Sequence, residues 1–179
     1  QIYRQREIWM RAASTDLAGG RIGTALAAYD HAGMVRTEWS RDDAIAALID
    51  DWNDDFDPTR TALILAHRRV DVRELNERAR AKLIERGMIE EGFAFRTEDG
   101  SRNFAAGDQI VFLKNEGSLG VKNGMLAKVV DAAPGRIVAE IGQGDERRQV
   151  TVEQRFYANV DHGYATTVHK SQGATVDSV

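Results

Sequence analysis

The sequence contains no cysteine, which excludes disulfide bonds and thiolate zinc sites and fits a reducing compartment. Aromatic residues make up only 7% of its 179 residues, and the three tryptophans, Trp9, Trp39 and Trp52, are expected to pack in a core. No apolar run approaches the length that crosses a membrane. We therefore expect a cytoplasmic chain with no membrane partner.

Neither sign of charge dominates, since the sequence has 24 Lys and Arg residues and 28 Asp and Glu residues, which gives a net charge of −4. This balance argues against a uniformly basic nucleic-acid coat. It leaves room for a local DNA groove, because binding depends on the face that contacts phosphate. The chain begins with Gln and ends just after a motif, so we expect it to be a segment of a longer protein.

The first half of the chain alternates helical and strand-like patterns. Apolar residues at i, i+3, i+4 and i+7 predict helices over residues 22–29 and 45–52, with a short strand possible at 34–37 between them. The compact apolar run at 61–66 is typical of a strand buried on both faces. Another helix is expected to begin near Asp71 and end near Gly87. This alternation predicts an α/β layer with a parallel sheet.

The helical period disappears after about residue 92. Short strand-like runs then alternate with turn pairs such as Asp99-Gly100 and Asn123-Gly124, which suit tight hairpins. The runs are residues 93–95, 110–113, 125–130, 137–141 and 149–152. We interpret them as a small β-barrel inserted in the α/β domain and removable without unfolding it. The predicted division is 1–90, 91–157 and 158–179.

The final residues form the most informative motif, Tyr164-Ala-Thr-Thr-Val-His-Lys-Ser-Gln-Gly-Ala-Thr-Val-Asp-Ser-Val179. A strand end runs into a polar loop that is expected to open a helix. Hydroxyl, imidazole, ammonium and bare backbone N–H groups meet there within one turn. Such a set suits a phosphate chain, because N–H groups at a helix start and a cation both favour anions. The alternative is an ordinary polar strand-to-helix turn.

This motif resembles motif V of superfamily-1 helicases, most closely their RecD-like branch. Residues 1–20 resemble the segment after motif III in TraA-type conjugative relaxase-helicases, and residues 63–67 resemble their motif IV region. Residues 107–112 and 119–124 resemble the SH3-like insertion of RecD-like helicases. The resemblance implies an α/β fold, the second RecA-like (P-loop NTPase-like) helicase domain, with an inserted SH3-like β-barrel.

The resemblance also implies a nucleotide-binding set. Arg4 matches the arginine that reaches across the cleft toward the γ-phosphate, where a permanently charged fork of donors suits the transition state. Gln5, Gln172 and Gly173 are expected at the same nucleotide. The alternative for Arg4 is a surface arginine on a helix.

A second implied set contacts single-stranded DNA, with Thr167 on a phosphate and His169 near sugar or base. Lys170 adds charge, and His67 and Arg68 follow a buried strand beside the DNA path. The alternatives are helix capping by Thr167, a solvated His169, Lys170 or Arg68, and a structural His67. No metal site is expected, because the four histidines lack ligand-like spacing.

The function implied by the resemblance is the ATP-dependent DNA helicase region of a bacterial conjugative relaxase. Its partners would be single-stranded DNA, ATP with Mg²⁺, the first RecA-like domain of the same protein, and relaxosome and type IV secretion components. The sequence has no phosphate loop and no acidic magnesium motif, so this segment alone is expected to bind no cofactor and hydrolyse no ATP. The alternative is a non-catalytic module whose barrel binds nucleic acid or protein.

Overall fold

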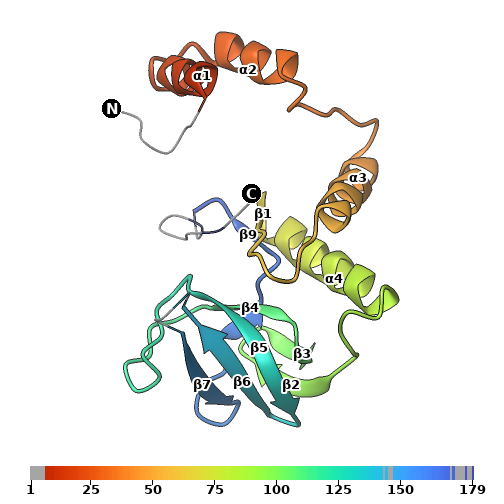
Figure 1. The fold of residues 1–179 in the computed structure, drawn as a ribbon, viewed down its shortest axis with the longest axis vertical. Coiled ribbons are helices and arrows are strands. Elements are labelled where there is room, and N and C mark those ends of the chain that lie inside the picture. Colours follow the sequence, from red (N-terminus) through yellow and green to blue (C-terminus); the bar gives the residue numbers. More distant parts are fainter. Residues whose placement is uncertain (1–6, 143, 145–146, 170, 172–175, 177–178) are drawn as a thin grey trace. The chain divides into compact units, whose positions relative to one another are not determined.

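The computed structural model describes residues 7–142, 144, 147–169, 171, 176 and 179 (Figure 1). The chain divides into two compact units, Gln1–Ala46 and Ala47–Val179, and each is described by itself. Among the described residues, no helix is both long enough and apolar enough to cross a membrane.

The first unit contains two helices, α1 (Ile8–Ala18) and α2 (Ile22–His31), which contact each other. Trp9 of α1 packs edge-on against Tyr29 of α2, with ring centroids 5.2 Å apart. The prediction of a helix over residues 22–29 is therefore confirmed. Helix α3 (Arg41–Asp54) spans the second predicted helix and begins at a cap, where the Ser40 hydroxyl accepts the N–H of Asp43 at 3.1 Å.

The connection between α2 and α3 differs from the prediction. Residues 34–38 are irregular backbone rather than a strand, because none of the described strands pairs with them. Trp39 was expected in a core but is fully exposed, since it lies in the bend before α3 and no described side chain covers it. Trp52 is buried, as predicted.

The α/β part of the second unit is built on two strands from distant parts of the sequence (Figure 1). Strand β1 (Ile64–Ala66) pairs in parallel with β9 (Ala165–Thr167). Helix α4 (Arg69–Glu85) packs against both strands and buries the apolar residues Leu75, Ala79 and Leu83. The helix ends at Glu85, and Gly87, two residues later, has the positive φ of 67° that suits a glycine C-terminal to a helix. Parallel pairing covered by a helix is the predicted arrangement.

The strand-rich part contains one antiparallel sheet and one hairpin. The sheet has the order β7–β6–β5–β4–β8, and the hairpin pairs β2 with β3. Their bounds are β2 Phe93–Thr97, β3 Gly100–Phe104, β4 Gln109–Phe112, β5 Leu126–Ala133, β6 Arg136–Ile141, β7 Arg148–Glu153 and β8 Val160–His162. Phe95 and Phe104 of the hairpin share one buried core with Ile110 and Phe112 of the sheet. Among the described residues the strands form an open sheet and a hairpin, so a closed barrel is not shown.

Strand β8 connects the strand-rich part to the parallel pair. It pairs with β4 through Ile110 and His162, and β9 begins at Ala165. Gly163 lies between them, where an added Cβ would come within 2.7 Å of the Ile110 carbonyl carbon. Gly163 and Tyr164 thus join the two sheets, and at Gly163 there is no room for a side chain. The sheet includes residues beyond 157, and the division into domains stays a prediction.

Candidate nucleic-acid interface

The carboxyl ends of β1 and β9 lie side by side. Ala66 is paired with Thr167, and the N–H of Val168 donates to the Ala66 carbonyl at 3.2 Å. His67 and Arg68 follow β1 directly, and His169 follows β9. The structure therefore brings four of the predicted DNA-contacting residues to one edge of the parallel pair. Ligands in open α/β sheets bind at this edge.

The loop after β9 is a compact turn. The carbonyl of Thr167 accepts the N–H of Ser171 at 3.1 Å, and the Ser171 hydroxyl donates to the Val168 carbonyl at 2.8 Å. Thr167 is half-buried at the strand end, whereas His67 and His169 are exposed. The two imidazoles are thus accessible to a ligand at the edge. The predicted residues Arg4, Gln5, Lys170, Gln172 and Gly173 lie outside the described residues.

Arg68, at the N-cap of α4, is oriented by an acid in the first turn of that helix. Its guanidinium donates to both carboxylate oxygens of Asp71, at 2.8 and 2.9 Å, and its side chain is 56% exposed. A two-point pair of this kind fixes the plane of the guanidinium. Arg68 is therefore held at the edge, and a phosphate would compete with Asp71 for the same donors.

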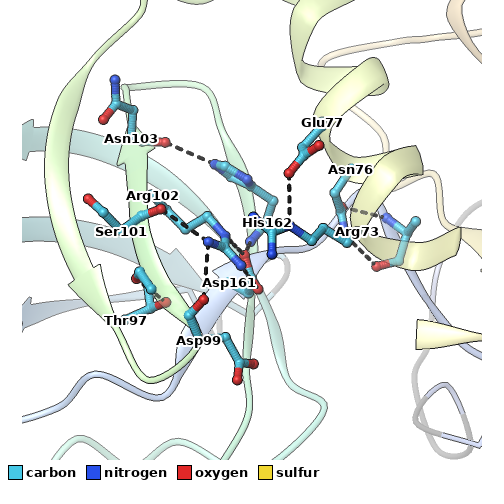
Figure 2. A network of polar contacts seen from close by, with 12 residues as sticks. Arg73, Asn76, Glu77, Thr97, Asp99, Ser101, Arg102, Asn103, Asp161 and His162 are labelled. Atoms are coloured by element: carbon cyan, nitrogen blue, oxygen red, sulfur yellow. Dashed lines mark hydrogen bonds and ion pairs between the residues drawn. The ribbon is translucent and has the colours of Figure 1, made fainter. Parts of the chain in front are cut away.

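A groove of about 480 Å³ adjoins this edge. Helix α4, strand β9, strands β4 and β8, and the β2–β3 hairpin line it, and Figure 2 shows several of its polar residues. Its arginines are Arg69, Arg73 and Arg102, and its acids are Glu77, Asp99 and Asp161. Arg102 pairs with Asp161 at 2.9 Å, and Arg73 pairs with Glu77 at 3.0 Å. The groove therefore carries balanced charge. The sequence analysis missed Arg73 and Arg102, because they come together with the edge only in three dimensions.

A buried polar network lies next to the groove. Asp108 has no exposed surface, and its carboxylate accepts from the Arg80 guanidinium at 3.1 Å and from the Tyr164 hydroxyl at 2.6 Å. Burial, and then the charge of Asp108, raise the pKa of Tyr164 far above its usual value. The phenol therefore stays protonated as a donor at every physiological pH. Burial also lowers the pKa of His162, whose Nε2 lies 2.9 Å from the Asn103 carbonyl (Figure 2).

From the sequence, Gly107-Asp108 is expected only as a turn, and this network is not predicted. One pattern points to it. Asn76 and Arg80 occupy positions on the buried face of α4 beside Leu75, Ala79 and Leu83, where an amphipathic helix is normally apolar. Buried polar side chains need partners, so both residues indicate distant hydrogen-bonding groups.

No group of three or more His, Asp or Glu residues in the described part of the chain is placed to hold a metal ion. The residues expected at ATP, Arg4, Gln5, Gln172 and Gly173, lie outside that part. The described edge offers imidazole, hydroxyl and guanidinium groups, which suit the sugar-phosphate backbone of a nucleic acid.

Comparison with known proteins finds relatives at high identity. No family model matches the sequence. Over 178 residues the chain is 65% identical to "Conjugal transfer protein TraA" of Rhizobium radiobacter and 63% identical to "Probable conjugal transfer protein TraA" of Sinorhizobium fredii. The resemblance to TraA-type conjugal transfer proteins is confirmed. The matches cover 99% of this chain and 16% of each TraA protein, so the chain corresponds to a small part of them.

Solved structures with a similar fold are Pif1 helicases from Bacteroides. A complex with ADP-AlF3 and single-stranded DNA matches with a TM-score of 0.56 and 19% identity, covering 99% of this chain and 43% of that one. A Pif1 bound to single-stranded DNA matches with a TM-score of 0.57 and 17% identity, covering 98% and 42%. Likeness at this identity shows the fold alone. The predicted mixed α/β fold, like that of the RecA-like domains of these helicases, is therefore confirmed for this chain.

Proposed function

We propose that this chain is part of the ATP-dependent DNA helicase region of a conjugative relaxase that works in the bacterial cytoplasm. In this proposal it forms the second RecA-like domain, with residues 91–157 as an SH3-like insertion between 1–90 and 158–179. One observation carries the proposal. His67, Arg68, Thr167 and His169 gather at the carboxyl edge of the β1–β9 pair. The TraA relatives and the helicase-like fold support it.

The edge serves single-stranded DNA. Thr167 contacts a phosphate, His169 lies against sugar or base, and Lys170 adds positive charge. Arg68 reaches a neighbouring phosphate by exchanging Asp71 for it. The exposed His67 completes the edge from β1. Because these groups contact backbone and stack rather than contact base edges, binding has little sequence preference.

ATP with Mg²⁺ occupies a separate cleft, shared with the first RecA-like domain of the same protein. Bound ATP supplies the phosphoryl transfer that drives movement along DNA. Arg4 binds the γ-phosphate, and Gln5, Gln172 and Gly173 contact the nucleotide. The first domain provides the phosphate cradle and the metal ligands, so the segment alone binds no cofactor and does not hydrolyse ATP. Relaxosome and type IV secretion components are further partners of the whole protein.

The DNA contacts are tested by Thr167→Ala combined with His169→Ala in the full-length protein. Single-strand affinity should fall about tenfold, because one backbone hydrogen bond and one base contact are lost. The salt dependence of binding should become shallower, since each phosphate contact contributes about −0.7 to the slope of log K against log salt. Fluorescence anisotropy with a labelled oligonucleotide, repeated over a salt series, measures both.

A matched control replaces the same residue types elsewhere, with Thr151→Ala on β7 and His31→Ala at the end of α2. Both side chains are exposed, and neither residue belongs to β1, β9 or the segments that follow these strands. This control should bind DNA like the unmodified protein. Equal affinity and slope in all three proteins would reduce Thr167 to a capping residue and His169 to a solvated side chain.

A further inference from the structure

Strand β9, which leads into the DNA-contacting loop, is held on one side by a side chain. It has three residues, and among the described strands it pairs only with β1. On its other side the Asn76 side-chain oxygen accepts the N–H of Ala165 at 2.9 Å. The Asn76 amide nitrogen donates to the Ala165 carbonyl at 3.1 Å (Figure 2). One buried amide on α4 thus takes the place of a neighbouring strand.

The residue before β9 is fixed even more tightly. The Tyr164 hydroxyl donates to Asp108 Oδ1 at 2.6 Å and accepts the N–H of Gln109 at 3.3 Å. The Tyr164 carbonyl accepts the N–H of Ile64 at 2.8 Å. Its ring packs edge-on against Trp52, with centroids 5.7 Å apart. Donor and acceptor of the phenol are both used, so its orientation is fully determined.

Asp108, together with Arg80, connects this tyrosine to three other segments. Its carboxylate accepts from Arg80 on α4 and from the N–H of Ala105 at 2.7 Å. Arg80 also donates to the carbonyls of Glu90 and Glu91, at 3.1 and 3.0 Å. The buried Asp108–Arg80 pair therefore joins α4, the chain entering the hairpin, the turn before β4, and the entry to β9.

We propose that Asp108, acting through Tyr164, is a positioning residue for the DNA-contacting loop. It fixes the start of β9, and so holds Thr167 and His169 in the orientation that meets the strand. It also ties this loop to the strand-rich sheet, so that the two move as one body. The role in DNA binding rests on the function proposed above, whereas the mechanical role does not.

Tyr164→Phe tests the proposal, because it removes the hydroxyl and leaves the ring against Trp52. In the full-length protein, the single-stranded DNA concentration giving half-maximal ATPase stimulation should rise about tenfold, the effect of losing a hydrogen bond to a charged group. Turnover at saturating DNA should stay within about twofold, since the lost hydroxyl contacts Asp108 and Gln109 and none of the residues proposed at the nucleotide. An unchanged half-saturation would overturn the proposal.

Ile137→Val separates positioning from general stability. It removes one methyl group from the core of the strand-rich sheet, where Ile137 is 1% exposed. We expect it to lower the free energy of unfolding about as much as Tyr164→Phe does. Half-saturation by DNA should not change in this variant. A shift as large as that of Tyr164→Phe would show that any loss of stability weakens DNA binding, and would contradict a positioning role.

A readout without DNA distinguishes the proposal from the function on which it rests. Amide hydrogen exchange of residues 165–168 should be about tenfold faster in Tyr164→Phe, with residues 137–141 unchanged, because only β9 is released. If residues 165–168 exchange at the same rate in Tyr164→Phe as in the unmodified protein, Asp108 and Tyr164 do not fix β9. If exchange changes but Thr167→Ala with His169→Ala leaves DNA binding intact, the DNA function fails and the positioning of β9 stands.

Discussion

Replacing Asp108 with alanine is expected to lower the free energy of unfolding by about 3–5 kcal/mol, because it leaves a buried guanidinium without its carboxylate. The Arg80 side chain is 9% exposed and that of Asp108 is not exposed at all. The substitution also removes the acceptor for the Tyr164 hydroxyl and for the N–H of Ala105. Several buried donors thus lose one partner together, and this is costlier than the loss of a single surface ion pair.

Urea denaturation of the protein measures this effect. The control Asp131→Ala removes an exposed carboxylate that pairs with Arg136 at 2.9 Å, and it should cost no more than about 1 kcal/mol. Combining Asp108→Leu with Arg80→Met should be less destabilising than the sum of the single changes, because no charge is then left buried alone. If Asp108→Ala lowers the free energy of unfolding as little as the control does, water or other groups must take the place of the carboxylate beside Arg80.

Arg4→Ala in the full-length protein is expected to reduce ATP hydrolysis on the order of a thousandfold, the loss typical of an arginine that stabilises the transferred phosphoryl group. The expectation rests on the resemblance of residues 1–20 to the segment that follows motif III. ATP affinity should change little, because the proposed contact strengthens in the transition state rather than in the bound ground state.

Steady-state hydrolysis and equilibrium nucleotide binding measure the two quantities separately. Arg136→Ala is a suitable control, since Arg136 is a partly exposed arginine on β6 with Asp131 as its partner. It should hydrolyse ATP at the unmodified rate. Hydrolysis at that rate in Arg4→Ala itself would make Arg4 a surface residue of its segment.

Periodicity and turn chemistry predicted the local elements well. The apolar stripe of α4, the compact run at β1 and the Asn-Gly and Asp-Gly turns each depend on neighbours within a few residues. Strands β3 and β8 were missed, because their short sequences carry little alternation and their places are set by pairing with β2 and β4. The prediction that Trp39 packs in a core was wrong, because the apolar character of a residue does not determine which other residues cover its side chain.

Long-range polar contacts could not be predicted from the sequence. Asp108 meets Arg80 and Tyr164 across 28 and 56 residues, and Asn76 meets Ala165 across 89. The predicted edge residues did come together, because the carboxyl ends of parallel strands meet whatever the intervening chain does. Motif resemblance thus located the candidate site. The polar contacts that hold the site in place could be identified only in the structure.

The same contacts change one expectation about the strand-rich part. Its pattern suggests that residues 93–152 can be removed without unfolding the α/β part. Removal would take away Asp108 and Gln109, and with them the partners of Arg80 and Tyr164. We now expect such a deletion to leave buried donors unsatisfied and the remaining chain poorly folded.

The most direct test of the central claim is amide hydrogen exchange of the full-length protein with and without single-stranded DNA, at low salt where backbone contacts are strongest. We predict that DNA slows amide exchange at residues 67–69 and 166–169, on the two sides of the β1–β9 edge. Exchange at residues 136–141 of β6 should not change. Protection of the strand-rich sheet with an unprotected edge would contradict the account and would favour a binding module carried by that sheet.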